Sequence, residues 1–276
     1  LTVFTAQERK EWEPVIKEVE ERTGWNVRVE TGSAKEMLSQ LEKEEADWDV
    51  AFGVSADALE EGKEYWQTGK DAWTGYSAVS FVILYNTNVV TYRELPTGWD
   101  SLLEPRWKGR VAVPDPLKSD MAASVLTEAA KNSEKEEFLD LLAENMQYQM
   151  PETFKEVEQG ISDGRYSIGV TSEEAAKAML AAGQDVDYID PEEGECFFED
   201  GTAIRKRTPN LDASEAFVTY TTCDDTKWLL RTQLLRQPAE DVAAENDRSD
   251  EELKQRYSRQ QEVLNIWKLI MEEKTG

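Results

Sequence analysis

The sequence predicts an α/β protein built from two lobes, and three observations lead to that prediction. At 276 residues, the chain has the length of two lobes of roughly 130 residues each. Strand-like runs alternate with amphipathic helical stretches near the start of the chain, and the alternation returns after an interruption. Hydrophobic residues make up 39% of the chain, which is enough to bury a core. Such alternation is typical of parallel sheets with helices on both faces.

Three strand–helix units open the chain. The first begins with the β-rich run LTVFTA, and its helix carries apolar residues at helical spacing before a closing glycine. The second combines an alternating strand with a helix that begins at a serine, and the third follows the same order. The units span residues 1–24, 25–46 and 48–64.

The later elements predict a second α/β lobe inserted between two parts of the first. A long apolar strand at 76–90 is followed by a stretch interrupted by proline and tryptophan, and a Ser-Asp cap then opens a helix at 119. The expected helices lie at 119–132, 134–146, 151–164 and 172–183, the strands at 166–171 and 185–190, and a strand-like run at 201–207 precedes further helices. We expect lobe 1 to comprise residues 1–84 and 205–276, and lobe 2 residues 85–204.

Charge and composition exclude several classes of function. Lys and Arg number 31 against 57 Asp and Glu, and a net charge of −26 repels nucleic acid and anionic lipid; the densest basic run is IRKR at 204–207. The absence of histidine excludes a His-based triad or zinc site, so we expect neither a cofactor nor a metal. Cys196 and Cys223 permit one disulfide without requiring it.

The loops that follow the first three strands predict a ligand-binding rim. In a parallel α/β sheet, the carboxyl ends of the strands meet at one edge, where ligands bind. The three loops, TAQE, ETGSAK and FGVSAD, carry small or hydroxyl residues that lead into helices, so free backbone N–H groups point to the same space. Each loop alone is compatible with an ordinary helix N-cap, whereas three convergent loops favour binding.

Six stretches in order resemble the extracytoplasmic solute-binding proteins of ABC importers, in the branch that handles iron, thiamine, phosphonates and hexose phosphates. The most specific stretch is LPTGWDSLLEPRWKGRVAVPDPLKSD, and the others are LTVFTAQ, ADWDVAFGVSADAL, TGYSAVSFVILYNTNVV, GRYSIGVTSEEAA and DPEEGECFFEDGTAIRKRTPN. The resemblance implies a two-lobed type II periplasmic-binding-protein fold. Each lobe is then a mixed, mostly parallel sheet flanked by helices, with a ligand cleft between lobes that close by hinge bending.

The same resemblance, carried over position by position, implies which residues contact the ligand. From lobe 1 they are Ala6, Gln7, Thr31, Gly32, Ser33, Ala34, Ser55, Ala56 and Asp57, with Tyr76 and Ser77 at the crossover. From lobe 2 they are Ser119, Asp120, Thr171, Ser172, Glu173, and the loop residues Glu195 and Cys196. No catalytic residue is expected.

Departures from the family pattern bear on the ligand. Where ferric-ion members carry adjacent tyrosines, this chain has Thr171-Ser172-Glu173, so iron is not expected. Where members that bind phosphorylated ligands carry small hydroxyl residues, it has Glu195-Cys196, and a carboxylate there repels phosphate unless it is paired. A phosphorylated sugar or organophosphonate is still the first expectation, and a cationic solute such as thiamine or a polyamine is the alternative.

The Glu195-Cys196 pair also raises the possibility of an enzyme. A thiamine-cleaving enzyme shares this fold and uses a cysteine with a glutamate, but adjacent residues on an extended loop project to opposite sides. We therefore expect one of the two to face the cleft and the other to pack in the interior, with no catalysis.

The resemblance further implies partners and location. The expected partners are a small-molecule ligand and ABC permease subunits, or the ectodomain of a sensor kinase, and the protein is expected to be a monomer that does not bind nucleic acid. We expect it in the periplasm or as a cell-surface lipoprotein, with any signal segment absent from this chain.

Overall fold

The computed structural model describes residues 1–67, 72–242 and 248–275. The chain divides into two compact units, one of residues 1–78 and 199–258 and the other of residues 79–198 and 259–276. The chain passes between the units after residues 78 and 198, a few residues before the expected lobe boundaries after 84 and 204. The segment that begins at residue 259 belongs to the second unit, whereas it was expected in lobe 1. The division into lobes 1–84 with 205–276 and 85–204 stays a prediction.

A mainly parallel sheet forms the first unit. Strand β1 pairs in parallel with β2 and β3, and β8 pairs with β3 in antiparallel fashion, with Val50 opposite Ile204. In chain order, the first strands and α-helices of this unit are β1 (Thr2–Thr5), α1 (Arg9–Thr23), β2 (Arg28–Thr31), α2 (Ala34–Glu42), β3 (Val50–Ser55) and α3 (Ala56–Glu61). Strand β8 spans Cys196–Ile204. The predicted order of three strand–helix units is confirmed.

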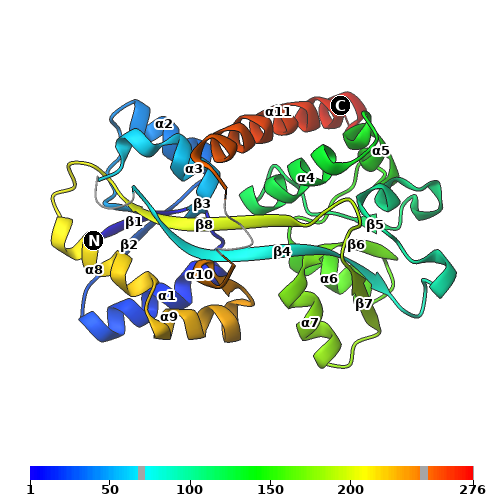
Figure 1. The fold of residues 1–276 in the computed structure, drawn as a ribbon, viewed down its shortest axis with the longest axis horizontal. Helices are drawn as coiled ribbons and strands as arrows, with labels where there is room; N and C mark the ends of the chain where they lie inside the picture. Colours follow the sequence, from blue (N-terminus) through cyan, green and yellow to red (C-terminus); the bar gives the residue numbers. More distant parts are fainter. Residues whose placement is uncertain (68–71, 243–247, 276) are drawn as a thin grey trace. The chain divides into compact units, whose positions relative to one another are not determined.

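Helices cover both faces of this sheet (Figure 1). On one face, Phe4 and Val54 pack against α2 and α3, and Trp48 is buried among them. On the other face, Val3 and Phe52 pack against α1, α8 (Leu211–Thr221) and α9 (Asp224–Leu229). Alternate residues of a strand point to opposite faces, which is why these buried strands are apolar along their length.

The chain returns to the first unit after β8 and is not wholly helical there. A π-helical turn at Leu230–Leu234 leads to the two-residue strand β9 (Gln237–Pro238), which pairs with Ser77 and Ala78. The helices α10 (Ala239–Val242) and α11 (Asp250–Thr275) follow. The expectation of helices alone after residue 207 is wrong at β9, because two residues are too few to produce a strand pattern.

Strands β5, β6 and β7 and most of β4 belong to the second unit. Strand β4 (Thr74–Asn86) pairs in antiparallel fashion with β6 (Ile168–Ser172) and β7 (Val186–Ile189), and β6 pairs in parallel with β5 (Val111–Ala112). Its helices are α4 (Asp120–Asn132), α5 (Phe138–Asn145), α6 (Phe154–Ser162) and α7 (Glu173–Ala181). Short 3₁₀ helices lie at Lys63–Tyr65, Tyr92–Glu94, Trp99–Leu103 and Pro105–Trp107.

The core of the second unit also has two sides (Figure 1). On one side, Phe81 and Ile83 pack with residues of α4, α5 and the end of α11. On the other side, Val82 and Leu84 pack with residues of α6 and α7. Strands β4 and β8 and helix α11 each contain residues of both units.

A half-buried carboxylate, that of Glu193, fixes the segment that carries Trp99. The carboxylate of Glu193 accepts hydrogen bonds from the backbone N–H groups of Trp99 at 2.9 Å and Asp100 at 3.1 Å. A negative charge is favourable there because these N–H groups begin a helical turn. Gly98 lies directly against this carboxylate, and a Cβ atom at position 98 would overlap it.

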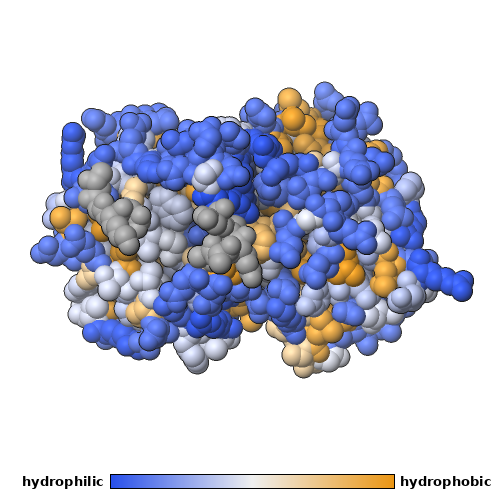
Figure 2. Space-filling model, in the orientation of Figure 1, coloured by the Kyte–Doolittle hydropathy of each residue, from blue (hydrophilic) through white to orange (hydrophobic). Residues whose placement is uncertain are grey.

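The surface agrees with the acidic composition. The face seen in Figure 2 is hydrophilic over most of its area, with apolar residues in separate patches. Among the residues that the structure describes, no helix is both long and apolar enough to cross a bilayer.

Candidate functional site

Two of the expected ligand residues, Gln7 and Ser77, meet at one buried carboxylate in the first unit. Asp200, in β8, accepts hydrogen bonds from Gln7 Nε2 at 2.9 Å, from Ser77 Oγ at 2.7 Å and from Ser77 N at 3.1 Å. Arg236 Nη1 lies 2.6 Å from Asp200 Oδ2 and 2.9 Å from Ser77 Oγ. Asp200 and Ser77 are fully buried, and Arg236 nearly so. The network thereby joins the segment after β1, the beginning of β4, the middle of β8 and the residue before β9.

Gln7 is held at three points. Its backbone N–H donates to Thr5 Oγ1 at 3.2 Å, and its side-chain Nε2 donates to Asp200. Its amide also packs on the backbone of Gly53, where a Cβ atom would overlap Gln7. Gly53 has φ of 62°, a left-handed conformation that glycine adopts without strain, and it lies at the register shift between β3 and β8. Ala6, which precedes Gln7 in the chain, is half-buried.

Tyr76 is a core residue of the first unit. Its ring contacts Phe52 edge-on with ring centroids 4.7 Å apart, and its side chain is 2% exposed. Its hydroxyl has no hydrogen-bond partner in the described parts of the chain. Burial, reinforced by the nearby charge of Asp200, raises the pKa of Tyr76 well above its usual range.

The start of α2 already holds a carboxylate. Ser33 caps the helix by accepting from Glu36 N at 3.2 Å, and Glu36 Oε2 accepts from Ser33 N at 2.8 Å and from Ser33 Oγ at 3.0 Å. This reciprocal arrangement is a capping box. The neighbouring expected residues Thr31, Gly32 and Ala34 are exposed, half-buried and buried, respectively. Two donors of this helix end, the N–H and the hydroxyl of Ser33, are therefore engaged by the chain's own Glu36.

At the start of α3, the expected ligand residue Asp57 lies close to other charged side chains. Ser55 caps α3 by accepting from Ala58 N at 3.4 Å, and Ala56 is buried. Asp57 is 4% exposed and lies 3.7 Å from Arg256 Nε. Burial raises the pKa of neighbouring Glu199 to about 7, with Arg248 opposing and Asp200 and Asp57 adding to the increase.

Glu199 also lines a pocket in the first unit. This pocket has a volume of about 740 Å³, and its wall carries the carboxylates of Glu60, Glu199, Glu240 and Asp250 and the indole of Trp73. Lys63 is the single cation among its described lining residues, and it pairs with Glu60 at 2.9 Å and Asp250 at 2.6 Å. The pocket therefore has a negative lining with an aromatic surface.

The expected residues of the second unit are engaged within that unit. Ser119 caps α4 by accepting from Ala122 N at 3.3 Å, and Asp120 lies in the first turn, half-buried. Thr171 is fully buried and donates to Glu158 at 2.7 Å, and Ser172 caps α7.

Glu173, in the first turn of α7, has polar neighbours from three elements. Its carboxylate accepts from Ser80 Oγ at 3.3 Å and from the Tyr188 hydroxyl at 3.5 Å, and it pairs with Lys177 at 2.9 Å. The start of α7, like the start of α2, therefore carries a carboxylate.

The expected loop at Glu195-Cys196 is corrected at its second residue. Cys196 is the first residue of β8, and its side chain is 1% exposed in the apolar core of the second unit, whereas Glu195 is exposed. The two side chains lie in opposite surroundings because successive residues of extended backbone point to opposite sides. Neither Cys196 nor Cys223 forms a disulfide.

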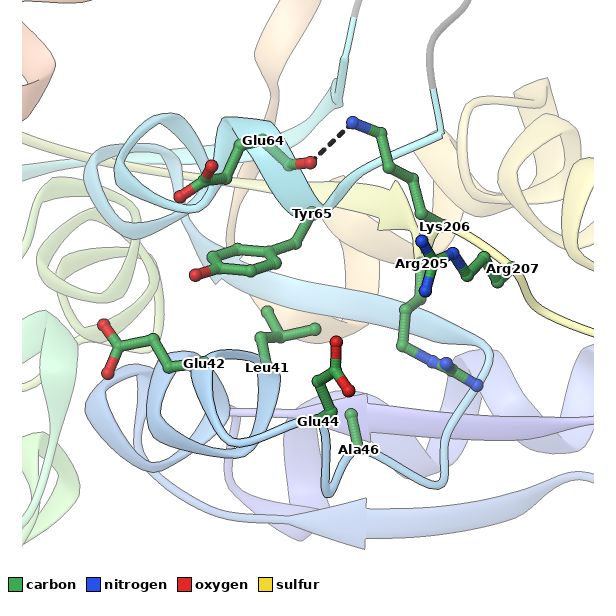
Figure 3. A pocket seen from close by; sticks show the side chains of 9 residues that line it. All are labelled: Leu41, Glu42, Glu44, Ala46, Glu64, Tyr65, Arg205, Lys206 and Arg207. Atoms are coloured by element: carbon green, nitrogen blue, oxygen red, sulfur yellow. Dashed lines mark hydrogen bonds between the residues drawn. The ribbon is translucent and has the colours of Figure 1, made fainter.

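A second groove in the first unit is lined by charged residues of both signs (Figure 3). It has a volume of about 450 Å³, and it has a basic side, Arg205 to Arg207, and an acidic side with Glu42 and Glu64. Lys206 Nζ donates to the carbonyl oxygen of Glu64 at 2.5 Å. The groove adjoins the end of β8 that pairs with the start of β3, whereas the expected ligand loops follow the other ends of the strands.

Sequence reasoning missed the residues that organise the first unit's site, namely Asp200, Arg236, Glu199 and Arg256. One signal was present for two of them. Glu199 and Asp200 are adjacent acids directly before the strand-like run at 201–207, and if the strand begins earlier, one of them points into the interior. Within the described part of the chain, no group of three or more Cys, Asp or Glu residues is arranged to hold a metal ion.

The family model described as "Bacterial extracellular solute-binding protein" matches residues 50–261. No curated protein matches the sequence.

Solved structures share the fold at low sequence identity. The periplasmic binding protein AfuA from Actinobacillus pleuropneumoniae, with fructose-6-phosphate bound, is 14% identical with a TM-score of 0.78, covering 99% of this chain and 98% of its own. A ferric binding protein from Campylobacter jejuni is 16% identical with a TM-score of 0.77, covering 98% and 99%. A two-component system protein described as mediating signal transduction is 19% identical with a TM-score of 0.65, covering 90% of each chain.

Proposed function

This chain belongs to the bacterial extracellular solute-binding proteins, and from that membership we propose that it is the receptor of an ABC importer for a small polar solute. Members of this family bind solutes, and the family is extracytoplasmic. The periplasm or the cell surface, with a lipid anchor in the second case, is the proposed location. Capture by closure of two lobes is proposed as the mechanism, with bending in the segments that contain residues of both units, β4, β8 and α11.

The charges of the expected ligand residues support a solute that is cationic or rich in hydroxyl groups. The expected set contains the carboxylates of Asp57, Asp120, Glu173 and Glu195 and no lysine or arginine. The helix ends that were expected to attract an anion carry acids in their first turns, and at α2 the carboxylate of Glu36 occupies that position. A phosphate would meet like charge at these helix ends, whereas an ammonium group or sugar hydroxyls would meet acceptors.

The acid-lined pocket of the first unit supports the same class of solute. Its four acidic residues outnumber its one ammonium group, and the lining includes the indole of Trp73, a ring type that attracts cations. Asp57 interacts electrostatically with Glu199, so one expected ligand residue lies close to the lining of this pocket.

A phosphorylated sugar or organophosphonate remains the second proposed ligand class. Its support is the similarity in fold to a binding protein whose structure contains fructose-6-phosphate. In that case, cations outside the expected set would have to neutralise the phosphate.

The test is a thermal-shift screen followed by titration calorimetry. The panel contains spermidine, thiamine, glucose, glucose 6-phosphate, methylphosphonate and inorganic phosphate. A solute at 100 times its Kd stabilises the folded state by about 2.7 kcal/mol, which raises the melting temperature visibly. We expect shifts with the amines or the neutral sugar. A shift confined to the phosphorylated compounds would overturn the proposed charge preference, and no shift with any solute would count against the receptor role.

Two matched variants then test whether the carboxylate of Glu173 contacts the solute. Glu173→Gln should weaken binding of a cationic solute, whereas Glu174→Gln removes a carboxylate from the same helical turn and should have little effect. Glu174 lies outside the expected set and pairs with Lys177 at 3.1 Å. Equal effects of the two substitutions would argue for a general electrostatic field instead of contact at Glu173.

A sensor role is the second candidate function, favoured by the similarity to a two-component system protein. A sensor and an importer receptor both need binding of the solute. Pull-down of the purified, solute-loaded protein with its own importer subunits or with a receptor-kinase ectodomain separates the two. Binding to the ectodomain alone would replace the importer by the sensor.

A further inference from the structure

The side chain of Gln7 is oriented by a residue that only accepts hydrogen bonds. Asp200 is paired with the Arg236 guanidinium at 2.6 Å, and a carboxylate in such a pair has acceptor oxygens and no donor. The side-chain group that faces Asp200 at 2.9 Å must therefore be the NH₂ of Gln7. The other end of the amide, Oε1, is consequently fixed as well.

Gln7 Oε1 is a buried acceptor without a partner. The residue is 8% exposed, and Oε1 has no hydrogen-bond partner in the described parts of the chain. A buried amide oxygen that loses water without gaining a donor is unfavourable, so such an atom calls for a donor from elsewhere. The Tyr76 hydroxyl is also unpartnered there, but a hydroxyl both donates and accepts, so it does not discriminate between solutes. An amide oxygen only accepts, so it discriminates between solutes that carry a donor and solutes that do not.

Rotation of the Gln7 amide is opposed on each side. Exchange of Nε2 and Oε1 would place an oxygen against Asp200 Oδ2, where two acceptors repel. The amide also packs on the backbone of Gly53, which has room for it because position 53 has no side chain. Asp200 itself is held by Ser77 and Arg236. The orientation of Gln7 thus depends on a chain of contacts that begins at Arg236.

We propose that Asp200 and Arg236 are positioning residues that lock Gln7 with its amide oxygen toward the solute, so that the protein selects solutes carrying an N–H or O–H donor at that point. This inference rests on the proposed function and deepens it. It predicts discrimination against solutes whose corresponding group is only an acceptor, such as a fully ionised phosphate or a carboxylate. Donor-bearing groups are ammonium, amide N–H and sugar hydroxyls.

The first arm of the test measures preference. Kd values are determined by calorimetry for spermidine and glucose, which carry donors, and for inorganic phosphate and succinate at pH 8, which are mainly acceptors. In Asp200→Asn, the new amide can donate to Gln7, so Gln7 can present its NH₂ instead. We expect the preference for donor-bearing solutes to fall by about tenfold or more, the factor set by one mismatched buried hydrogen bond.

The second arm does not require a solute. In nitrogen-15 NMR spectra, the Gln7 side-chain amide, assigned by its loss in Gln7→Leu, should show one downfield proton that exchanges slowly, because that proton is bonded to a carboxylate. Asp200→Asn should shift this proton upfield and speed its exchange. An unchanged Gln7 signal would overturn the orientation.

Two further variants separate positioning from folding. Asp200→Asn removes the nearer charge partner of Arg236, at 2.6 Å, and leaves Glu11 at 3.9 Å. The double variant Asp200→Asn/Arg236→Met, which removes both charges of the buried pair, is therefore measured beside it and should show the same loss of preference. Thr202→Val alters a buried residue on the same strand whose hydroxyl has no hydrogen-bond partner in the described parts of the chain, and it should keep the wild-type preference.

The outcomes distinguish the two proposals. If the wild-type protein binds none of the solutes, the receptor role fails while the NMR arm still decides the Gln7 orientation. If it binds donor-bearing solutes and Asp200→Asn keeps the wild-type preference, the receptor role stands and the positioning role is wrong. Wild-type binding confined to phosphate or succinate would also overturn the positioning role.

Discussion

Arg236 and Asp200 form a buried ion pair in which Nη1 lies 2.6 Å from Oδ2, and the two side chains are 4% and 0% exposed. The pair joins the segment before β9 to β8, and Ser77 and Gln7 supply further hydrogen bonds to it. A pair buried this completely costs much when one member is removed, because the other charge remains in the interior without compensation.

Arg236→Met should therefore lower the free energy of unfolding by about 3–5 kcal/mol, the range for a broken buried pair. The matched control is Arg231→Met, five positions earlier, whose partner Asp241 is 2.7 Å away at the surface. An exposed pair contributes about 0–1 kcal/mol, so the control should stay close to wild type. Urea denaturation followed by circular dichroism measures both. Equal losses would contradict the dominant role of the buried pair.

Gly53→Ala should be more harmful than Gly24→Ala, although both glycines have left-handed backbone angles, φ of 62° and 72°. At Gly24 an added Cβ has open space, so only backbone strain of about 1 kcal/mol is expected. At Gly53 the Cβ would overlap Gln7, and we expect at least about 1 kcal/mol more. The excess should shrink in a Gln7→Ala background, since the obstructing amide is then gone. An excess that persists there would place the clash elsewhere.

Glu199 should make the protein less stable as pH rises from about 4.5 to 7. Burial raises its folded-state pKa to about 7, from an ordinary value of 4.5. Between these values the unfolded chain has released the proton while the folded chain still holds it, so stability falls by at most about 1.4 kcal/mol per pH unit. Below pH 4.5 both states are protonated, and above 7 the loss is complete.

Glu199→Gln should remove this dependence. Urea midpoints at pH 5 and pH 7.5 should differ less in the variant than in the wild type. Glu240→Gln, on the same pocket but 60% exposed and paired with Lys227, is the control and should keep the wild-type difference. The assignment to Glu199 is wrong if the variant keeps that difference too.

The two thiols should react at very different rates. Cys223 is half-buried, whereas Cys196 is 1% exposed in the core of the second unit. Ellman's reagent should titrate Cys223 in the native protein and reach Cys196 only after denaturation, since a thiol must be accessible to react. Cys196→Ala should also retain solute binding. Rapid reaction of Cys196 in the native protein would restore the enzyme hypothesis.

The sequence was most informative where structure is decided locally. The helix caps at Ser33 and Ser119 follow from a side chain acting within its own turn, and Gly24 ends α1 in the left-handed conformation that glycine favours. The order of three strand–helix units was equally accessible, because hydrophobic periodicity is a property of neighbouring residues.

The polar network could not be predicted in the same way. Gln7 and Asp200 are 193 positions apart, and Arg236 meets Ser77 across 159. Nothing in the local pattern of Arg236 distinguishes it from a surface arginine such as Arg231. The expected ligand residues were taken from a resemblance, and their roles in solute binding remain predictions. What the structure adds is the residues that hold Gln7 and Ser77.

The contact between Gly98 and Glu193 has an evolutionary consequence. Because a Cβ at position 98 would overlap the Glu193 carboxylate, and because that carboxylate holds the N–H groups of Trp99 and Asp100, the two positions constrain each other. A side chain at 98 requires the Glu193 carboxylate to move away or to be shortened, and the N–H groups of Trp99 and Asp100 then need another acceptor. We expect these two sites to change together or not at all.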